Sequence, residues 1–179
     1  MDSKAKPEIL ISRREIETAV CRLAAQISKD YRGKHPVLVA ILKGSFIFMA
    51  DLIRYLDLPL EVEFIRLSSY GQGKESSGEV KVVQGLGAEI KDRDVLVIED
   101  IVDTGLTTRF LLDYLRQQEP SSIKLCALTS KPSRRKLPVT IDYLGFTVPD
   151  KFIVGYGIDW DEQFRRLPDI CFIEESKEE

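Results

Sequence analysis

The sequence predicts an α/β fold in which an open parallel sheet is flanked by helices. Residues 37–42 (VLVAIL) and 94–98 (DVLVI) are short, largely apolar runs without alternation, which is typical of parallel strands buried on both faces. Each run is followed, after a short polar connection, by a stretch with the apolar spacing of a helix. Strands that alternate with helices imply right-handed crossovers and therefore a parallel sheet.

The other elements follow from the same patterns. Ser12 and Glu15 have capping-box spacing ahead of a helical apolar pattern, so a helix is expected from residue 13 to near Gly33. Two more helices are expected at residues 45–56 and 107–118. The expected strands are residues 37–42, 61–68, 80–83, 94–98, 123–128, 141–146, 152–156 and 170–173.

Composition limits the classes of function. The 179 residues fit one domain, and a net charge of −3 gives no broad basic surface, so nucleic acid is not an expected partner. No apolar stretch reaches the length of a membrane span and residues 1–7 are polar, so we expect no membrane association and a cytoplasmic location. Cys21, Cys126 and Cys171 lack metal-ligand spacing and are expected to be buried thiols.

The strongest chemical signal follows the second buried strand. Ligands of such sheets bind outside the carboxyl ends of the strands. There Glu99 and Asp100 precede residues 103–108 (DTGLTT), whose backbone N–H groups, hydroxyls and helix start suit one phosphate. Two acids beside a phosphate need a sugar diol or a magnesium ion between them, and a ribose 5-phosphate has both features. A strand end with solvated acids and a capped helix would explain any two of these residues, but not the whole string.

This string resembles the phosphoribosyl diphosphate binding motif of the type I phosphoribosyltransferases. The resemblance extends over nearly all of the chain to the hypoxanthine-guanine phosphoribosyltransferases, above all the short bacterial members. It is carried further by residues 42–45 (LKGS), 69–70 (SY), 131–134 (KPSR) and 149–159 (PDKFIVGYGID). It implies a type I phosphoribosyltransferase fold in a single domain, residues 1–179, with a small hood subdomain built from the N-terminal and C-terminal segments.

The resemblance implies roles for the residues around the sugar phosphate. Glu99 and Asp100 would bind the ribose hydroxyls, and Asp103 would be the general base that faces N7 of the purine. The 5-phosphate would be held by Asp103, Thr104, Gly105, Leu106, Thr107 and Thr108. Leu106 departs from the family pattern, since other members carry lysine there.

The family pattern also implies the diphosphate residues. Lys43 and Gly44 match its diphosphate loop, where the missing side chain lets N–H groups approach an anion. Arg165 matches the arginine that pairs with diphosphate, and its neighbour Arg166 is the alternative. The family often holds the peptide before Lys43 in the cis form, which the sequence itself does not decide.

The purine would be bound by Lys131, Phe152, Ile153 and Asp159. Lys131 would donate to the 6-oxygen, the ring of Phe152 would stack on the base, and backbone groups of Ile153 would read its pyrimidine edge. Without the resemblance, residues 131–136 (KPSRRK) would be taken for a solvated basic loop and Phe152 for a core aromatic. Trp160 stands where the family commonly has tyrosine.

The resemblance further implies a cofactor, a closing loop and an assembly. Mg²⁺ would be bound by Glu99, Asp100 and Asp159, partly through water. Ser69 and Tyr70 would belong to a loop, residues 69–78, that closes over the ligands. The family usually assembles as homodimers or homotetramers.

The activity so implied is transfer of the 5-phosphoribosyl group from phosphoribosyl diphosphate to N9 of a 6-oxopurine, hypoxanthine or guanine. The products would be IMP or GMP and diphosphate. Two alternatives remain open at this point: a regulatory protein on the same scaffold that binds RNA, and a phosphoribosyltransferase for adenine or a pyrimidine. Near-neutral charge opposes the first, and Lys131, which needs an acceptor at the 6-position, opposes adenine.

Overall fold

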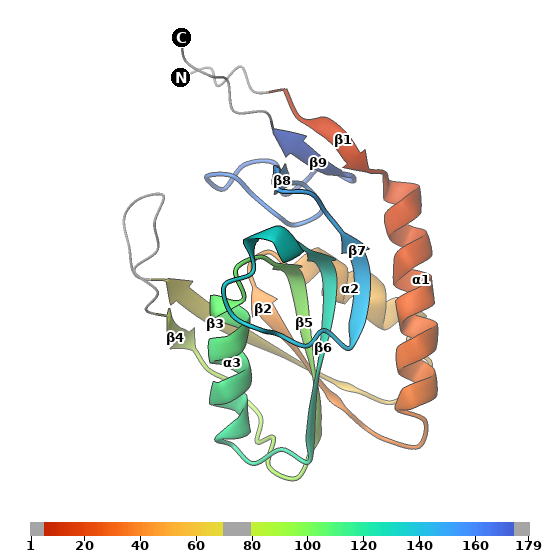
Figure 1. The fold of residues 1–179 in the computed structure, drawn as a ribbon. Helices are drawn as coiled ribbons and strands as arrows, with labels where there is room; N and C mark the ends of the chain where they lie inside the picture. The colour runs from red at the N-terminus through yellow and green to blue at the C-terminus, as the bar shows by residue number, and fades with distance from the viewer. Residues whose placement is uncertain (1–5, 70–79, 174–179) are drawn as a thin grey trace.

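The structure is a computed structural model that describes residues 6–69 and 80–173 (Figure 1). Residues 70–78 of the expected loop, which spans residues 69–78, lie outside the described residues, and with them Tyr70; of Ser69 only the backbone is described. No helix within the described ranges is long and apolar enough to cross a membrane.

The centre of the fold is a six-stranded sheet with the order β4-β3-β2-β5-β6-β7. All neighbouring pairs are parallel except β3 and β4, which pair antiparallel. Its strands are β2 (Val37–Leu42), β3 (Glu61–Ser69), β4 (Val80–Gln84), β5 (Asp94–Val102), β6 (Ser122–Ser130) and β7 (Tyr143–Thr147). The expected α/β fold with a mostly parallel sheet is confirmed.

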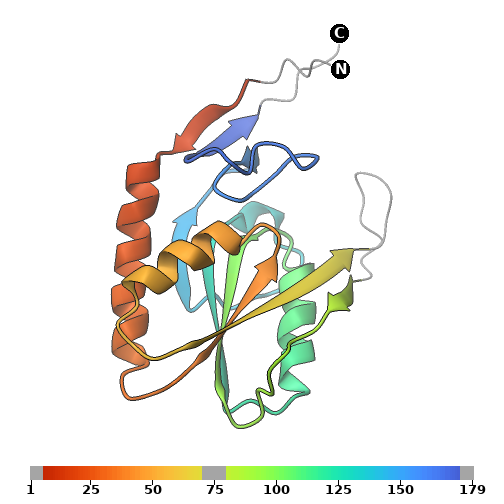
Figure 2. The same ribbon diagram turned by 180° about the vertical axis from the view of Figure 1, so that it is seen from behind.

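Helices cover both faces of this sheet. The helices are α1 (Arg13–Asp30), α2 (Phe46–Tyr55), α3 (Leu106–Arg116) and the short 3₁₀ helix η1 (Pro132–Arg134). Figures 1 and 2 show α1 and α2 on one face and α3 on the other. Along β2, Leu38 and Ala40 belong to the core on the first face, whereas Val37 and Val39 belong to the core under α3. Burial on both faces explains why the apolar run of β2 has no alternation.

Helix α1 begins with the expected capping box. The Ser12 side chain accepts a hydrogen bond from the Glu15 N–H at 3.4 Å, and the Glu15 carboxylate accepts from the Ser12 N–H at 2.8 Å. The helix ends at Asp30, ahead of Gly33, whose φ of +75° lies in the left-handed region. The buried face of α1 then packs on α2 and the sheet.

A second, antiparallel sheet joins the two ends of the chain. It has the order β1-β9-β8 and consists of β1 (Glu8–Ile11), β8 (Phe152–Val154) and β9 (Ile170–Ile173). The sequence patterns did not predict β1. Figure 1 shows this sheet beyond the carboxyl ends of the parallel strands, which is the edge where such folds bind ligands.

Several element boundaries differ from the expectation. β5 was expected to end at Ile98, but it continues to Val102 because Glu99 pairs with Ala127 and Val102 with Ser130 of β6. β8 ends earlier than expected, at Val154, since Gly155 and Gly157 take φ values of +96° and +99°. The expectation of three buried thiols is wrong for Cys21, which is only partly buried, whereas Cys126 and Cys171 are buried.

The capping box gives a first prediction. Ser12→Ala should lower the free energy of unfolding by about 1 kcal/mol, because it leaves a first-turn N–H without an acceptor. Chemical denaturation monitored by circular dichroism measures this difference. Ser121→Ala is the control, since Ser121 is exposed and its side chain makes no hydrogen bond with a described residue. An equal effect of the two variants would contradict the role of the cap.

Candidate active site

The expected site residues gather at the carboxyl edge of the parallel sheet. Lys43 and Gly44 follow β2, residues 103–108 follow β5, and Lys131 follows β6. The segment after β8 returns to the same edge, because a Cβ added at Gly157 would overlap the carbonyl of Gly44. Loops that are distant in sequence therefore meet at one place.

The two acids of β5 occupy opposite faces of the strand. Glu99 is buried on the α3 side, where its carboxylate accepts a hydrogen bond from the Thr108 hydroxyl at 3.0 Å. Burial, and then the charge of Asp100, raises the pKa of Glu99 well above its usual value. Asp100 faces Gly44 instead. Burial raises the pKa of Asp100 to about 6, although nearby backbone N–H groups and the charge of Arg165 act the other way.

Gly44 has no room for a side chain. A Cβ added there would overlap the carboxylate of Asp100, so only glycine lets the β2 loop lie against this acid. The peptide bond between Leu42 and Lys43 is cis. Gly44 is thus in close contact with both Asp100 and Gly157.

The loop after β5 has the shape of an anion site. Gly105 takes a φ of +83°, and a Cβ there would come within 2.8 Å of the Leu137 carbonyl oxygen. Helix α3 begins at the next residue, and of its first-turn N–H groups that of Leu106 donates to the Thr104 hydroxyl at 3.4 Å. First-turn N–H groups of a helix have no partner within the helix and suit an anion. The Thr108 hydroxyl, however, is engaged by Glu99.

Lys131 is a buried lysine beside the loop after β5. The residue is 5% exposed, and among the described residues no acceptor forms a hydrogen bond with its Nζ. Burial lowers the pKa of Lys131, while the charge of Asp103 acts to raise it. Asp103 itself lies 3.1 Å from Nε of Arg134, whose Nη1 lies 3.5 Å from Asp150. The sequence patterns did not single out Arg134 as a partner of Asp103.

The remaining purine residues lie on or near β8. Phe152 and Trp160 are both exposed, and their rings meet edge to face with centroids 5.9 Å apart. Phe152 is therefore not a core aromatic. The Ile153 side chain is buried, and its backbone belongs to β8, the edge strand of the small sheet.

Arg165 and Lys43 converge on a carboxylate that the sequence analysis did not assign. Nη2 of Arg165 lies 2.9 Å from Asp159 and 3.2 Å from Glu162, and its Nη1 donates to the Gly157 carbonyl at 2.8 Å. Nζ of Lys43 lies 2.7 Å from the other oxygen of Glu162. Arg166, the alternative to Arg165, is exposed.

Carboxylates suitable for a metal are sparse. No group of three or more His, Cys, Asp or Glu side chains with metal-binding geometry occurs in the part of the chain that the structure describes. Both carboxylate oxygens of Asp159 already accept bonds, from Arg165 and from the Glu162 N–H. The site thus offers Asp100 and few other direct protein ligands, which fits an ion that keeps most of its water, as Mg²⁺ does.

Comparison with known families agrees with this geometry. The family model described as "Phosphoribosyl transferase domain" matches residues 9–161. The chain belongs to this family. The resemblance found from the motifs is thereby confirmed.

Individual relatives of this phosphoribosyltransferase are similar over most of their length. A hypoxanthine-guanine phosphoribosyltransferase of Bacillus subtilis is 45% identical over 161 residues, which cover 90% of this chain and 89% of the relative. One of Aquifex aeolicus is 44% identical over 171 residues, 95% and 96% of the two chains. The crystal structure of a hypoxanthine-guanine phosphoribosyltransferase from Bacillus anthracis has a TM-score of 0.90 at 44% identity, covering 96% of this chain and all (100%) of that one.

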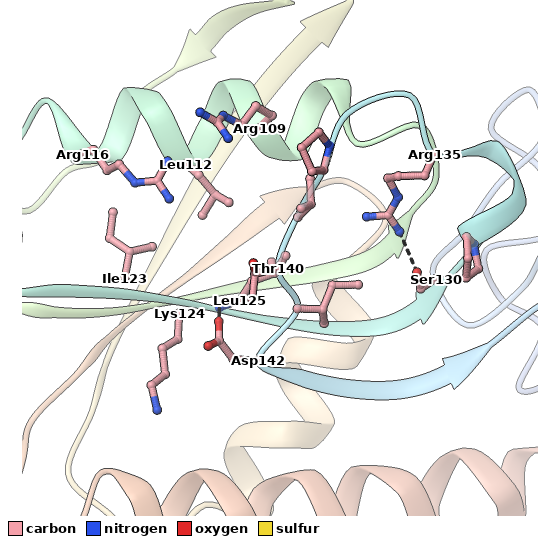
Figure 3. Close-up of a pocket in the computed structure, with 14 residues that line it drawn as sticks. Arg109, Leu112, Arg116, Ile123, Lys124, Leu125, Ser130, Arg135, Thr140 and Asp142 are labelled. Atoms are coloured by element: carbon pink, nitrogen blue, oxygen red, sulfur yellow. Dashed lines mark hydrogen bonds between the residues drawn. The ribbon is translucent and has the colours of Figure 1, made fainter.

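One cavity of this phosphoribosyltransferase lies away from the expected site. It has a volume of about 750 Å³ and lies between α3, β6 and residues 138–142 (Figure 3). None of the expected site residues lines it. Its two α3 arginines, Arg109 and Arg116, already pair with Asp113 at 2.8 and 2.7 Å. We assign the cavity no role.

The raised pKa of Asp100 gives a second prediction. A buried acid whose pKa rises on folding, here from 3.8 to about 6, favours the folded state when protonated, and that stability is lost as the pH rises through 6. Asp100→Asn removes the ionised form, so it should stabilise the free protein at pH 7.5 by about 1–3 kcal/mol.

The gain should shrink towards zero near pH 4, where the parent carboxyl is protonated. Thermal unfolding of both proteins at pH 7.5 and pH 4 measures it. Asp161→Asn, at an exposed acid, is the control. An equal gain at both pH values would show that ionisation of Asp100 is not the cause.

Proposed function

We propose that this chain transfers the 5-phosphoribosyl group of phosphoribosyl diphosphate to N9 of a 6-oxopurine in purine salvage. The products are IMP or GMP and diphosphate. One observation carries the proposal above the others: Lys131 is a largely buried residue whose amine has no hydrogen-bond acceptor in the described chain, and it lies near Asp103, the first residue of the anion loop. The names of the relatives, hypoxanthine-guanine phosphoribosyltransferases, support the same activity.

The sugar phosphate is bound by the carboxyl end of β5 and the turn that follows. Glu99 and Asp100 accept hydrogen bonds from the ribose hydroxyls, because carboxylate oxygens are hydrogen-bond acceptors. The 5-phosphate binds to the N–H groups and hydroxyls of residues 103–108. Because the Thr108 hydroxyl already donates to Glu99, the hydroxyls of Thr104 and Thr107 donate to the phosphate, and the Thr104 oxygen can still accept from the Leu106 N–H.

The base is recognised and activated on the opposite side of the anomeric carbon. Lys131 donates to the 6-oxygen, and Asp103 accepts the N7 proton as N9 attacks. The exposed ring of Phe152 stacks on the purine, with the Ile153 backbone and Asp159 near its 2-position. Arg134, whose Nε lies 3.1 Å from Asp103, positions its carboxylate.

The leaving diphosphate is stabilised by Lys43, Arg165 and the N–H groups at Gly44. Charge stabilisation at the departing group is the main task here, because loss of diphosphate leaves an oxocarbenium-like sugar. Mg²⁺, when bound with diphosphate, adds charge neutralisation to this task. Glu99, Asp100 and Asp159 would hold the ion, partly through water.

The expected domain organisation, closing loop, assembly and location are part of the same proposal. Residues 1–179 form one domain in which the β1-β9-β8 sheet is a hood over the site, and Ser69 and Tyr70 belong to a closing loop. The enzyme is a cytoplasmic homodimer or homotetramer that binds neither nucleic acid nor membranes.

Base choice is the third prediction and the main test. Hypoxanthine and guanine should be good substrates, whereas xanthine points a carbonyl oxygen at acceptors near the 2-position. An unpaired buried acceptor costs about 1–3 kcal/mol, so xanthine should lose about 10- to 100-fold in kcat/KM. Adenine should fail, because it presents an amino donor to Lys131. Diphosphate release measured with the four bases decides the matter, and turnover with adenine alone would overturn the proposal.

The fourth prediction concerns Asp103. Asp103→Asn keeps the shape and loses the base, so kcat should fall about 10²- to 10⁴-fold with little change in affinity for phosphoribosyl diphosphate. Asp150→Asn is a matched control, because Asp150 also contacts Arg134, at 3.5 Å, and lies outside the proposed machinery. Steady-state kinetics of both variants separates loss of the base from a change at Arg134. Unaltered turnover of Asp103→Asn would remove this residue from the mechanism.

A further inference from the structure

Glu162 occupies an unexpected place between two cations. One carboxylate oxygen lies 2.7 Å from Nζ of Lys43, and the other lies 3.2 Å from Nη2 of Arg165. The two cations come from different parts of the chain, the loop after β2 and the segment after β8. Both are the residues to which the proposed function assigns diphosphate. A protein carboxylate thus sits where the anionic ligand is expected.

A tight turn presents this carboxylate to the cations. The backbones of Trp160 and Gln163 are bonded to each other in both directions, at 3.2 and 2.9 Å, and the Glu162 N–H donates to Asp159 at 2.8 Å. Asp161 and Glu162 take φ values of +50° and +61°. The backbone of the turn is therefore held from several sides.

The side chain of Glu162 is much freer than its backbone. It is 64% exposed, whereas Arg165 is 19% exposed. The carboxylate can swing into solvent without disturbing any buried packing. Arg165 keeps its bonds to Gly157 and Asp159 when Glu162 leaves, so the cation stays in position.

The Glu162 carboxylate and a diphosphate compete for these two cations. Both anions use the same donors, the lysine ammonium and the guanidinium N–H groups, and they repel each other at contact distance. We propose that Glu162 is an internal competitor of diphosphate, which occupies the diphosphate subsite of the free protein and is displaced when the ligand binds. This inference rests on the proposed function.

Displacement of Glu162 has a consequence before the substrate binds and another after the transfer. Before binding, Glu162 holds Lys43 and Arg165 close together despite their like charge. After transfer, its return to the same cations opposes retention of the product diphosphate. Exposed ion pairs are individually weak, so competition should change diphosphate affinity by a moderate factor, about three- to tenfold.

The fifth prediction tests the competitor with Glu162→Gln. The amide keeps the size of the side chain and loses its charge, so the dissociation constant of diphosphate, measured by calorimetry with magnesium, should fall about three- to tenfold. The constant for product inhibition by diphosphate should fall by the same factor. Asp161→Asn is the matched control: it removes the same charge one residue away, from an exposed side chain that makes no hydrogen bond or ion pair with a described residue.

The sign of the change separates the competitor from a purely supporting residue. If Glu162 only positions the cations, Glu162→Gln weakens diphosphate binding, and that result overturns the inference, as does an affinity equal to that of the parent. Lys43→Ala and Arg165→Ala test the underlying assignment. If both bind diphosphate like the parent, the diphosphate site itself is wrong and the competitor with it. If they lose affinity while Glu162→Gln does not gain it, only the competitor is wrong.

Discussion

The site depends on two carboxylates carried inside a buried central strand. Ionised acids are expensive to bury, and the raised pKa values of Glu99 and Asp100 express that cost. The neighbouring structure is arranged around them. The first turn of α3 supplies the Thr108 hydroxyl to Glu99, and Gly44 has no side chain because the carboxylate of Asp100 takes the space. Burial of these acids lowers the stability of the folded protein, and it holds their acceptor oxygens in fixed positions.

The same constraint explains why distant segments meet there. Once Gly44 lies against Asp100, its carbonyl leaves no room for a Cβ at Gly157, so the segment after β8 also approaches without a side chain. That approach brings Arg165 to the edge of the sheet through its bond to the Gly157 carbonyl. The small sheet then fixes β8 by pairing it with β9, and β9 with β1. Two glycine contacts thus connect the β5 acids to the second sheet.

Sequence patterns predicted the strands whose bounds follow from burial, and they missed the strands and strand ends that follow from pairing with a neighbouring strand. The bounds of β2 and β9 agree with the structure, because an uninterrupted apolar run is buried wherever it pairs. The predicted end of β5 was too early, because the acids Glu99 and Asp100 were expected to lie beyond the strand, near solvent. The strand instead continues as long as β6 offers partners. β1 is four residues long, and its partner lies at the other end of the chain, so no local pattern marks it. The motifs singled out Arg165 but not Glu162, because the contact of Glu162 with Lys43 joins segments that are far apart in the sequence.

Nearly every exposed charge of the site has a partner before any ligand arrives. Asp103 pairs with Arg134, Asp159 with Arg165, and Glu162 with Lys43. Ion pairs near solvent contribute little free energy, so exchanging a protein partner for a ligand partner costs little free energy. The pairs also keep the side chains ordered before the ligand binds. Lys131 differs, because the residue is largely buried and no described acceptor bonds to its amine. A ligand acceptor there replaces water and no protein partner, so its bond favours bases that carry an acceptor at the 6-position.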